Sequence, residues 1–281
     1  MIQEIRIKNY LSFRDEVVLN FEATKDTTFE ECQVVNVTPT VRLLRFALIY
    51  GANASGKSNL LNAIDFLRGF WFNKKSDIDE ETGVIPFLLD TETPNEPSEF
   101  NVKFFVGDKR YWYALVLDNK QVIKENLYVY NSVQPSLVFS RELDSTVSLI
   151  KLNAGLVKAN ATIVEQLNVK CLSNMSFFAA RNQVNCSLAY IDDVRDWMKN
   201  NMMPIIEPGT RMFEYAGKQM EKNAELKAYI LDFVHKADYN ITDVYTEREK
   251  MPIPDFVKAS IMKDKDFPDK AKEKILAENP L

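Results

Sequence analysis

The sequence predicts an α/β fold in which a strand, a glycine-rich loop and a helix are followed by an antiparallel sheet and a helical subdomain. Three observations support this prediction. Residues 51–58 read Gly-Ala-Asn-Ala-Ser-Gly-Lys-Ser. An apolar run precedes them, and apolar residues recur after them at helical spacing. Residues 100–150 alternate between apolar and polar side chains, as half-buried strands do.

The octapeptide fits the phosphate-loop pattern G-x-x-x-x-G-K-[ST] without a mismatch. Small residues let consecutive amides converge on an anion, and Gly51 and Gly56 allow the tight path. Lys57 can reach the β- and γ-phosphates of ATP, and the hydroxyl of Ser58 is the expected ligand of Mg²⁺. The predicted nucleotide contacts in this segment are Gly51, Asn53, Ala54, Ser55, Gly56, Lys57, Ser58 and Asn59.

The residues around the loop supply its structural context. Leu43–Tyr50 is an apolar run of strand length, so we expect a strand that leads directly into the loop. Downstream, helical spacing predicts a helix from Ser58 that ends near Phe72–Lys75. The partial positive charge of its N-terminus would add to the phosphate site. A chance match in an ordinary turn is the alternative, and the order of strand, loop and helix argues against it.

Composition restricts the class of protein. The chain has 281 residues, 46% of them apolar and 27% charged, which is ordinary for a globular protein. No apolar run is long enough to span a bilayer, and no apolar signal core follows Met1, so we expect a cytoplasmic protein without membrane contact. A net charge of −5 gives no overall basic character for nucleic acid, although a local basic groove stays open.

Cysteine and histidine counts restrict the kind of site. The three cysteines are scattered, which predicts free thiols and neither a disulfide framework nor a zinc site. His235 is the only histidine, so the count excludes a histidine-rich metal site. Its neighbours favour a position on a helix surface or a partly buried one.

Periodicity divides the chain into three predicted parts. Residues 1–150 form a nucleotide-binding lobe, 151–246 a helical subdomain, and 247–281 a charged linker or the start of a missing C-terminal half. The first part is expected to hold strands around Ile5–Ile7 and Val17–Phe21, a loop over 23–42, a surface excursion over 76–99 and an antiparallel meander over 100–150 with a turn at Gly107–Asp108. The second is expected to hold helices over 160–172, 186–203 and 221–237, with Pro204 and Pro208 between the last two.

Two segments resemble a known group of ATPases. Ile5-Arg6-Ile7-Lys8-Asn9-Tyr10-Leu11-Ser12-Phe13 is similar to the opening of the SMC, RecF and OLD-like ATPases of the ABC class, and Ile49–Leu61 resembles their phosphate loop. The segments Pro86–Asp90, Tyr111–Tyr113 and Glu125–Leu127 resemble a bacterial branch described as AAA-15-type or abortive-infection ATPases, which includes phage-defence proteins. The resemblance covers about the first 130 residues.

The resemblance implies a P-loop NTPase with an ABC/SMC-type head. It implies that this chain is the N-terminal portion of that head. It further implies that Ser12, Phe13 and Arg14 line the nucleotide pocket. Arg14 would be a phosphate contact, because its planar guanidinium bridges two oxygens. A surface arginine in a β-turn is the alternative. In this class ATP joins two heads, so an ATP-dependent dimer or higher homo-oligomer is implied.

The chain departs from that class in one respect. We find no signature loop of the Ser-x-Gly kind and no convincing Walker B strand. Leu188–Asp193 imitates Walker B. However, its pattern continues through Val194–Met198 with amphipathic spacing, which favours a helix over a Walker B strand. We therefore expect either the N-terminal part of a longer ATPase or a split protein completed by another chain.

Three roles follow from these observations. The first is a defence ATPase that controls an attached or partner effector, such as a nuclease or toxin. The second is a RecF- or SMC-type DNA-repair ATPase, which would predict heptad arms and a basic surface that the sequence does not show. The third is a nucleotide-dependent assembly scaffold without turnover. The sequence assigns no catalytic residue and shows no basic groove for nucleic acid.

Overall fold

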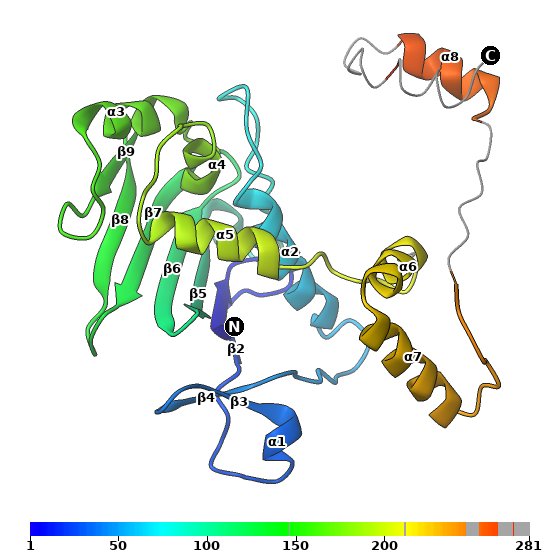
Figure 1. Ribbon diagram of the computed structural model, residues 1–281. Coiled ribbons are helices and arrows are strands. Elements are labelled where there is room, and N and C mark those ends of the chain that lie inside the picture. Colours follow the sequence, from blue (N-terminus) through cyan, green and yellow to red (C-terminus); the bar gives the residue numbers. More distant parts are fainter. Residues whose placement is uncertain (146, 211, 246–252, 264–271, 273–281) are drawn as a thin grey trace. The chain divides into compact units, whose positions relative to one another are not determined.

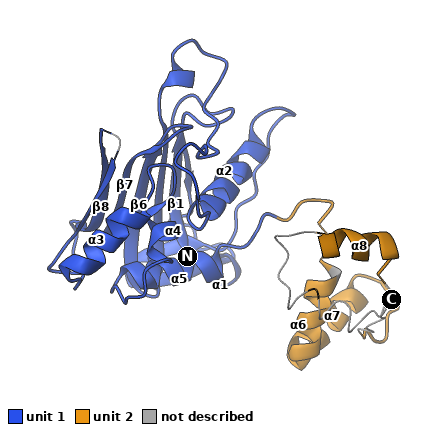
Figure 2. Ribbon diagram, turned by 90° about the horizontal axis from the view of Figure 1, so that it is seen from above, with its two compact units in different colours: residues 1–205 blue, residues 206–281 orange. Residues whose placement is uncertain are grey.

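The computed structural model describes the chain except residues 146, 211, 246–252, 264–271 and 273–281 (Figure 1). The chain divides into two compact units, Met1–Ile205 and Ile206–Leu281 (Figure 2). The phosphate loop and all the strands described below lie in the first unit. The boundary between the two compact units therefore follows residue 205. The division into three functional parts, with limits at 150 and 246, stays a prediction.

The first unit is built on one large sheet with the strand order β2-β1-β5-β6-β7-β8-β9, in which all neighbours are antiparallel (Figure 1). The alternation over 100–150 therefore correctly predicted a meander, and Gly107 makes its first turn with a φ of 60°. The strands are β1 (Ile2–Lys8), β2 (Val17–Asn20), β5 (Ser98–Val106), β6 (Lys109–Leu117), β7 (Val122–Tyr130), β8 (Ser136–Asp144) and β9 (Val147–Leu152).

One face of this sheet is covered by helices and forms the core. Cross-strand partners share a face, so Phe100, Tyr113 and Phe139 all point to the same side. Aromatic side chains of the helical layer pack onto them: Phe66 lies 5.3 Å from Phe100, Trp71 5.7 Å from Tyr113 and Phe177 4.0 Å from Phe139, between ring centroids. These helices are α2 (Lys57–Phe70), α3 (Ala161–Lys170), α4 (Phe177–Arg181) and α5 (Ile191–Asn201).

The prediction of a loop over residues 23–42 is wrong for much of its length. Helix α1 (Glu30–Gln33) is followed by a hairpin of β3 (Val34–Thr38) and β4 (Val41–Leu44). The β-branched residues of β3 favour extended backbone, and Leu43 of β4 is fully buried and bridges to Glu22. The polar composition of the segment concealed this pattern.

The predicted strand over Leu43–Tyr50 is also wrong for most of its length. Only Leu43 and Leu44 belong to a strand, and their partner is β3. Residues 46–50 lie outside every strand, with Phe46 53%, Leu48 69% and Tyr50 84% exposed. A strand needs a neighbour to accept and donate its main-chain hydrogen bonds, and the described residues offer this segment none.

The helical predictions are confirmed in outline. Helices α3 and α5 and, in the second unit, α7 (Ala224–Lys236) match the three predicted ranges, and Pro204 and Pro208 lie between α5 and α6 (Phe213–Lys222). His235 is exposed in the last turn of α7. The sequence reasoning did not predict α4 or α6. Most of 247–281 is outside the described residues, apart from α8 (Asp255–Lys263).

The predicted surface excursion over 76–99 is partly buried. Residues 76–99 contain the 3₁₀ turn η1 (Thr93–Asn95) and the first two residues of β5, and Val84 and Thr93 are buried, so part of this segment packs on the sheet. No helix within the described ranges is both long and apolar enough to cross a membrane.

Candidate nucleotide-binding site

The phosphate loop ends at Gly56, which is the N-cap of α2. Gly56 has a φ of 89°, which glycine adopts without strain, and it offers no side chain to cap the helix. The first amides of a helix have no partner within that helix, so they are available to an anion. Ala54 also has a positive φ, of 63°. The local backbone thus has the uncapped helix start that phosphate binding requires.

Lys57 is held inside the loop by main-chain oxygens. Its Nζ donates to the carbonyls of Gly51 at 2.8 Å and Ala52 at 2.7 Å, and lies 3.4 Å from Ser55 Oγ. These contacts place a positive charge against the loop. Exchanging neutral carbonyl partners for a charged phosphate would strengthen the hydrogen bonds of the ammonium group.

The turn between β1 and β2 packs directly on the loop. Tyr10 and Phe13 exchange main-chain hydrogen bonds across this turn, at 2.9 and 2.8 Å. A Cβ added to Gly56 would lie 2.8 Å from Ser12 Oγ and 3.2 Å from Phe13 Cε1. Asn59 Nδ2 donates to Ser12 Oγ at 2.9 Å, which joins the first turn of α2 to the same hydroxyl. Ser12 and Phe13 therefore lie beside the phosphate loop.

Asn9 connects this turn to the 85–97 segment. Its Nδ2 donates to the carbonyls of Thr93 at 2.8 Å and Glu96 at 2.9 Å, and its Oδ1 accepts from the amide of Phe87 at 2.9 Å. Leu11 also donates its amide to a carbonyl in this segment. Asn9 is 1% exposed and has a φ of 50°, which asparagine tolerates better than most residues. Asn9 thus holds an irregular segment in place beside the β1–β2 turn.

Arg14 forms an ion pair with Asp90, at 3.0 Å between Nε and Oδ2. The side chain of Arg14 is 60% exposed and that of Asp90 only 16%. Asp90 also accepts a hydrogen bond from the amide of Glu92, and this bond, followed by the charge of Arg14, lowers the pKa of Asp90 below its usual value. The carboxylate is therefore ionised at neutral pH.

These residues fit a magnesium-bound polyphosphate. The helix start is uncapped, Gly56 lets Ser12 and Phe13 pack closely against the loop, and Lys57 supplies positive charge. Ser58 is exposed, and its hydroxyl would hold Mg²⁺ together with phosphate oxygens and water. The described residues contain no cluster of three or more His, Cys, Asp or Glu for a metal held by protein alone. Bound magnesium would neutralise phosphate charge.

The structure brings together only part of the predicted set. Gly51, Ser55, Lys57 and Gly56 contact one another or the β1–β2 turn, whereas Asn53 is exposed without a described side-chain contact. Their contact with nucleotide stays a prediction. Sequence reasoning missed the roles of Asn9 and Asp90, although both lie in segments that resemble the ATPase group. Their function depends on contacts between distant segments, which no local pattern reports.

The Walker B imitation is a helix N-terminus, as the amphipathic pattern indicated. Asp192 lies in the first turn of α5, where its Oδ2 accepts from the amide of Leu188 at 2.8 Å. Its Oδ1 pairs with Arg181 at 2.8 Å. This carboxylate binds the segment before α5 and ties α4 to α5, and it has no described contact with the phosphate loop.

A buried charge network lies behind the phosphate-loop helix. Trp71, which follows α2, meets Tyr113 edge-on, and the Tyr113 hydroxyl donates to Glu125 at 2.8 Å. Glu125 pairs with Arg141 at 2.9 Å, and both side chains are fully buried. This network links the end of the helix to the centre of the sheet.

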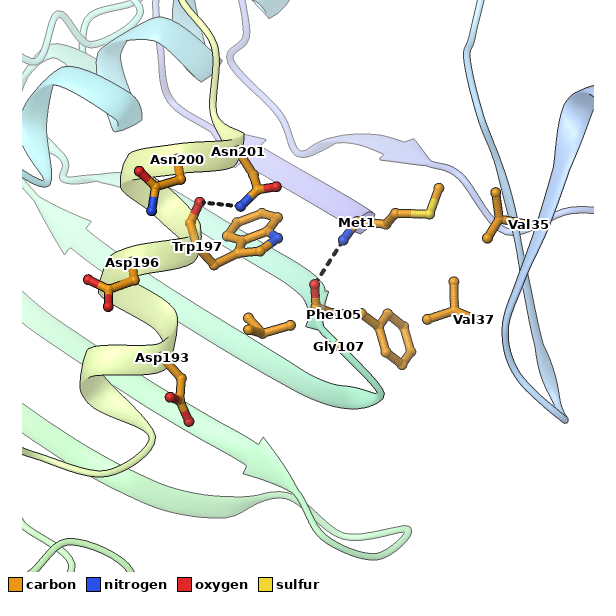
Figure 3. Close-up of a pocket in the computed structure, with 11 residues that line it drawn as sticks. Met1, Val35, Val37, Phe105, Gly107, Asp193, Asp196, Trp197, Asn200 and Asn201 are labelled. Atoms are coloured by element: carbon orange, nitrogen blue, oxygen red, sulfur yellow. Dashed lines mark hydrogen bonds between the residues drawn. The ribbon is translucent and has the colours of Figure 1, made fainter.

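A separate cleft of about 690 Å³ lies near the start of β1, whereas the β1–β2 turn follows the end of that strand. Figure 3 shows Val35 and Val37 of β3 on one side, Phe105 in the middle, and Asp193 and Asp196 of α5 on the other. No residue of the phosphate loop lines it. This cleft is therefore separate from the phosphate loop.

Comparison with known proteins gives one family match. The family described as "AAA domain, putative AbiEii toxin, Type IV TA system" matches residues 46–149. The match includes the phosphate loop, α2 and the meander up to the start of β9. No curated protein matches the chain. The family match supports a P-loop ATPase type of nucleotide binding.

Proposed function

We propose that this chain binds Mg-ATP through residues 51–58 and acts, when its site is completed, as an ABC/SMC-like ATPase. The observation that carries the proposal is the uncapped start of α2 behind Gly56, with Lys57 already held against the loop. Amides, lysine and helix dipole would act on the same anion. The family match over 46–149 supports the same class of function.

Each residue of the site has a defined role in this proposal. The loop amides and Lys57 bind the β- and γ-phosphates, and Ser58 holds the metal. Ser12 and Phe13 close one side of the loop, because they contact the position of Gly56. Arg14 supplies a second positive charge from the β1–β2 turn. These roles orient the triphosphate but do not activate water.

Mg-ATP is expected to stabilise the protein against heat. A ligand present at a hundred times its Kd adds about 2.7 kcal/mol to the free energy of unfolding. For a unit of this size, that raises the midpoint by about 5–10 °C. Differential scanning fluorimetry measures this shift, and adenosine without phosphates is the control that should leave the midpoint unchanged. Equal midpoints with and without Mg-ATP would contradict the proposed binding.

ATP turnover by the 281-residue chain alone is expected to be very slow. Among the described residues, no carboxylate forms a hydrogen bond or ion pair with Lys57 or Ser58. Hydrolysis requires a residue that orients the attacking water. A phosphate-release assay at saturating Mg-ATP measures the rate, and robust turnover would refute the incomplete-site hypothesis.

Residues 46–50 indicate where strands that carry the catalytic carboxylate would pair with this chain. Phe46, Leu48 and Tyr50 alternate with Ala47 and Ile49, so both faces of an extended segment would be apolar. Such segments are typical of parallel sheets that are covered on both faces. We propose that strands from outside the described residues pair with this segment and bring the catalytic carboxylate to the loop.

The biological role that we propose is ATP-gated control of an effector in anti-phage defence, in the cytoplasm. ATP would join two copies of the chain, and the attached or partner effector would be a nuclease or toxin. The family description, which names a toxin of a type IV toxin–antitoxin system, supports this role over a RecF- or SMC-type role in DNA repair.

The absence of a described carboxylate at the loop favours, as the second candidate, a scaffold that binds ATP without turnover. The phosphate-release assay on a completed protein separates the two.

A further inference from the structure

We propose that Asp90 is a positioning residue: its carboxylate binds the guanidinium of Arg14 and competes for it with the phosphates of a bound nucleotide. The inference rests on the proposed nucleotide binding and adds a competitor built into the site. It assigns a role to the 85–97 segment, which no part of the phosphate-loop motif explains.

The first step is the position of Arg14. The β1–β2 turn lies against the phosphate loop, because Ser12 Oγ accepts from Asn59 and would touch a Cβ at position 56. Arg14 is two residues further along this turn, and the amide of Asn9 donates to its carbonyl at 3.3 Å. The backbone that carries the Arg14 side chain therefore belongs to a turn that contacts the phosphate loop.

The second step is the difference between the two partners. Asp90 is 16% exposed and belongs to a segment that Asn9 holds at Phe87 and Thr93. Arg14 is 60% exposed, and Asp90 is its one described ion-pair partner. The aspartate is thus the fixed member of the pair, and the arginine is the member that can move.

The third step is the competition between anions. An exposed ion pair contributes little free energy, because water screens it. A triphosphate carries more charge than a carboxylate and offers paired oxygens to the guanidinium fork. Arg14 would therefore leave Asp90 when nucleotide binds, and Asp90 lowers the apparent affinity for as long as it competes.

The test is a double-mutant cycle with a non-hydrolysed ATP analogue and Mg²⁺, measured by calorimetry. Asp90→Asn removes the competing charge and should tighten binding about two- to fivefold, the range that an exposed ion pair supports. Arg14→Ala should weaken binding. In the Arg14→Ala background, Asp90→Asn should have no effect. Unchanged or weaker binding by Asp90→Asn overturns the proposal.

The second arm excludes a general effect of charge. If Asp90→Asn tightens binding equally with and without Arg14, the carboxylate merely repels the phosphates and the proposal is wrong. Asp79→Asn, a change at an exposed aspartate in a surface loop, is the matched control and should leave the affinity unchanged. Hydrogen exchange supplies an independent readout, since the analogue should increase exchange around Asp90 in wild type and not in Arg14→Ala.

Failure of this inference is distinguishable from failure of the proposed function. If wild type binds no analogue, the nucleotide site itself is wrong. If wild type binds and all three variants of the cycle bind equally well, the phosphate loop stands as the nucleotide site, and the roles of both Arg14 and Asp90 fall.

Discussion

Arg141→Ala is expected to lower the free energy of unfolding by about 3–5 kcal/mol, the cost of leaving a buried charge without its partner. Glu125, its partner at 2.9 Å, is fully buried and also accepts hydrogen bonds from Tyr113, Ser176 and the amide of Phe177. Without Arg141, a carboxylate stays in the core with neutral donors only. Urea unfolding followed by tryptophan fluorescence measures the loss.

Arg141 contributes more than its charge. It donates to the carbonyls of Leu172, Ser173 and Met175 and to the hydroxyl of Ser148. The segment between α3 and α4 is irregular, and Met175 is the one of these three residues whose carbonyl has no other described main-chain donor. We therefore expect Arg141→Ala to loosen this segment as well, which hydrogen exchange would detect.

Arg6→Ala is the matched control for this prediction. Arg6 is also a strand arginine with an ion pair, to Glu4 at 2.9 Å, but its side chain is 38% exposed. Its removal should cost less than about 1 kcal/mol, because solvent screens the pair. The double variant Glu125→Leu/Arg141→Leu should lose less stability than the sum of its two single variants, since neither charge is then left alone. Equal costs for Arg141→Ala and Arg6→Ala would show that burial is not the deciding factor.

Lys57→Ala is expected to abolish measurable nucleotide binding while the fold persists. A hydrogen bond to a charged group contributes about 1.5–3 kcal/mol, and this lysine would make such bonds to two phosphates. The unfolding midpoint without ligand should change little, because the ammonium contacts only loop oxygens near the surface. Fluorescence anisotropy of a labelled ATP analogue measures the affinity.

Lys74→Ala separates the site from a general loss of positive charge. Lys74 is exposed just beyond α2 and has no described contact with the phosphate loop. Its removal should leave the affinity within about twofold of wild type, as surface substitutions usually do. If Lys57→Ala binds the analogue as tightly as Lys74→Ala does, residues 51–58 are not the nucleotide site.

Local patterns predicted the elements whose signals are contained in short stretches of chain. The octapeptide and the helical spacing after it predicted α2, and strict alternation predicted the meander. The amphipathic pattern beyond Leu188 correctly favoured a helix over a Walker B strand. The run up to Tyr50 misled us, because an apolar composition shows that a segment tends to be buried and not which strand will pair with it.

What the sequence by itself determined is the phosphate loop, its helix and the strand periodicity, since each depends on residues that are neighbours in the chain. Only the tertiary structure decided that Ser12 meets Gly56, that Asp90 holds Arg14, and that Glu125 and Arg141 neutralise each other in the core. The physical reason is that a charge or a hydroxyl acquires its role from the partner beside it. Those partners lie from 16 to 76 residues apart along the chain, and folding alone brings them together.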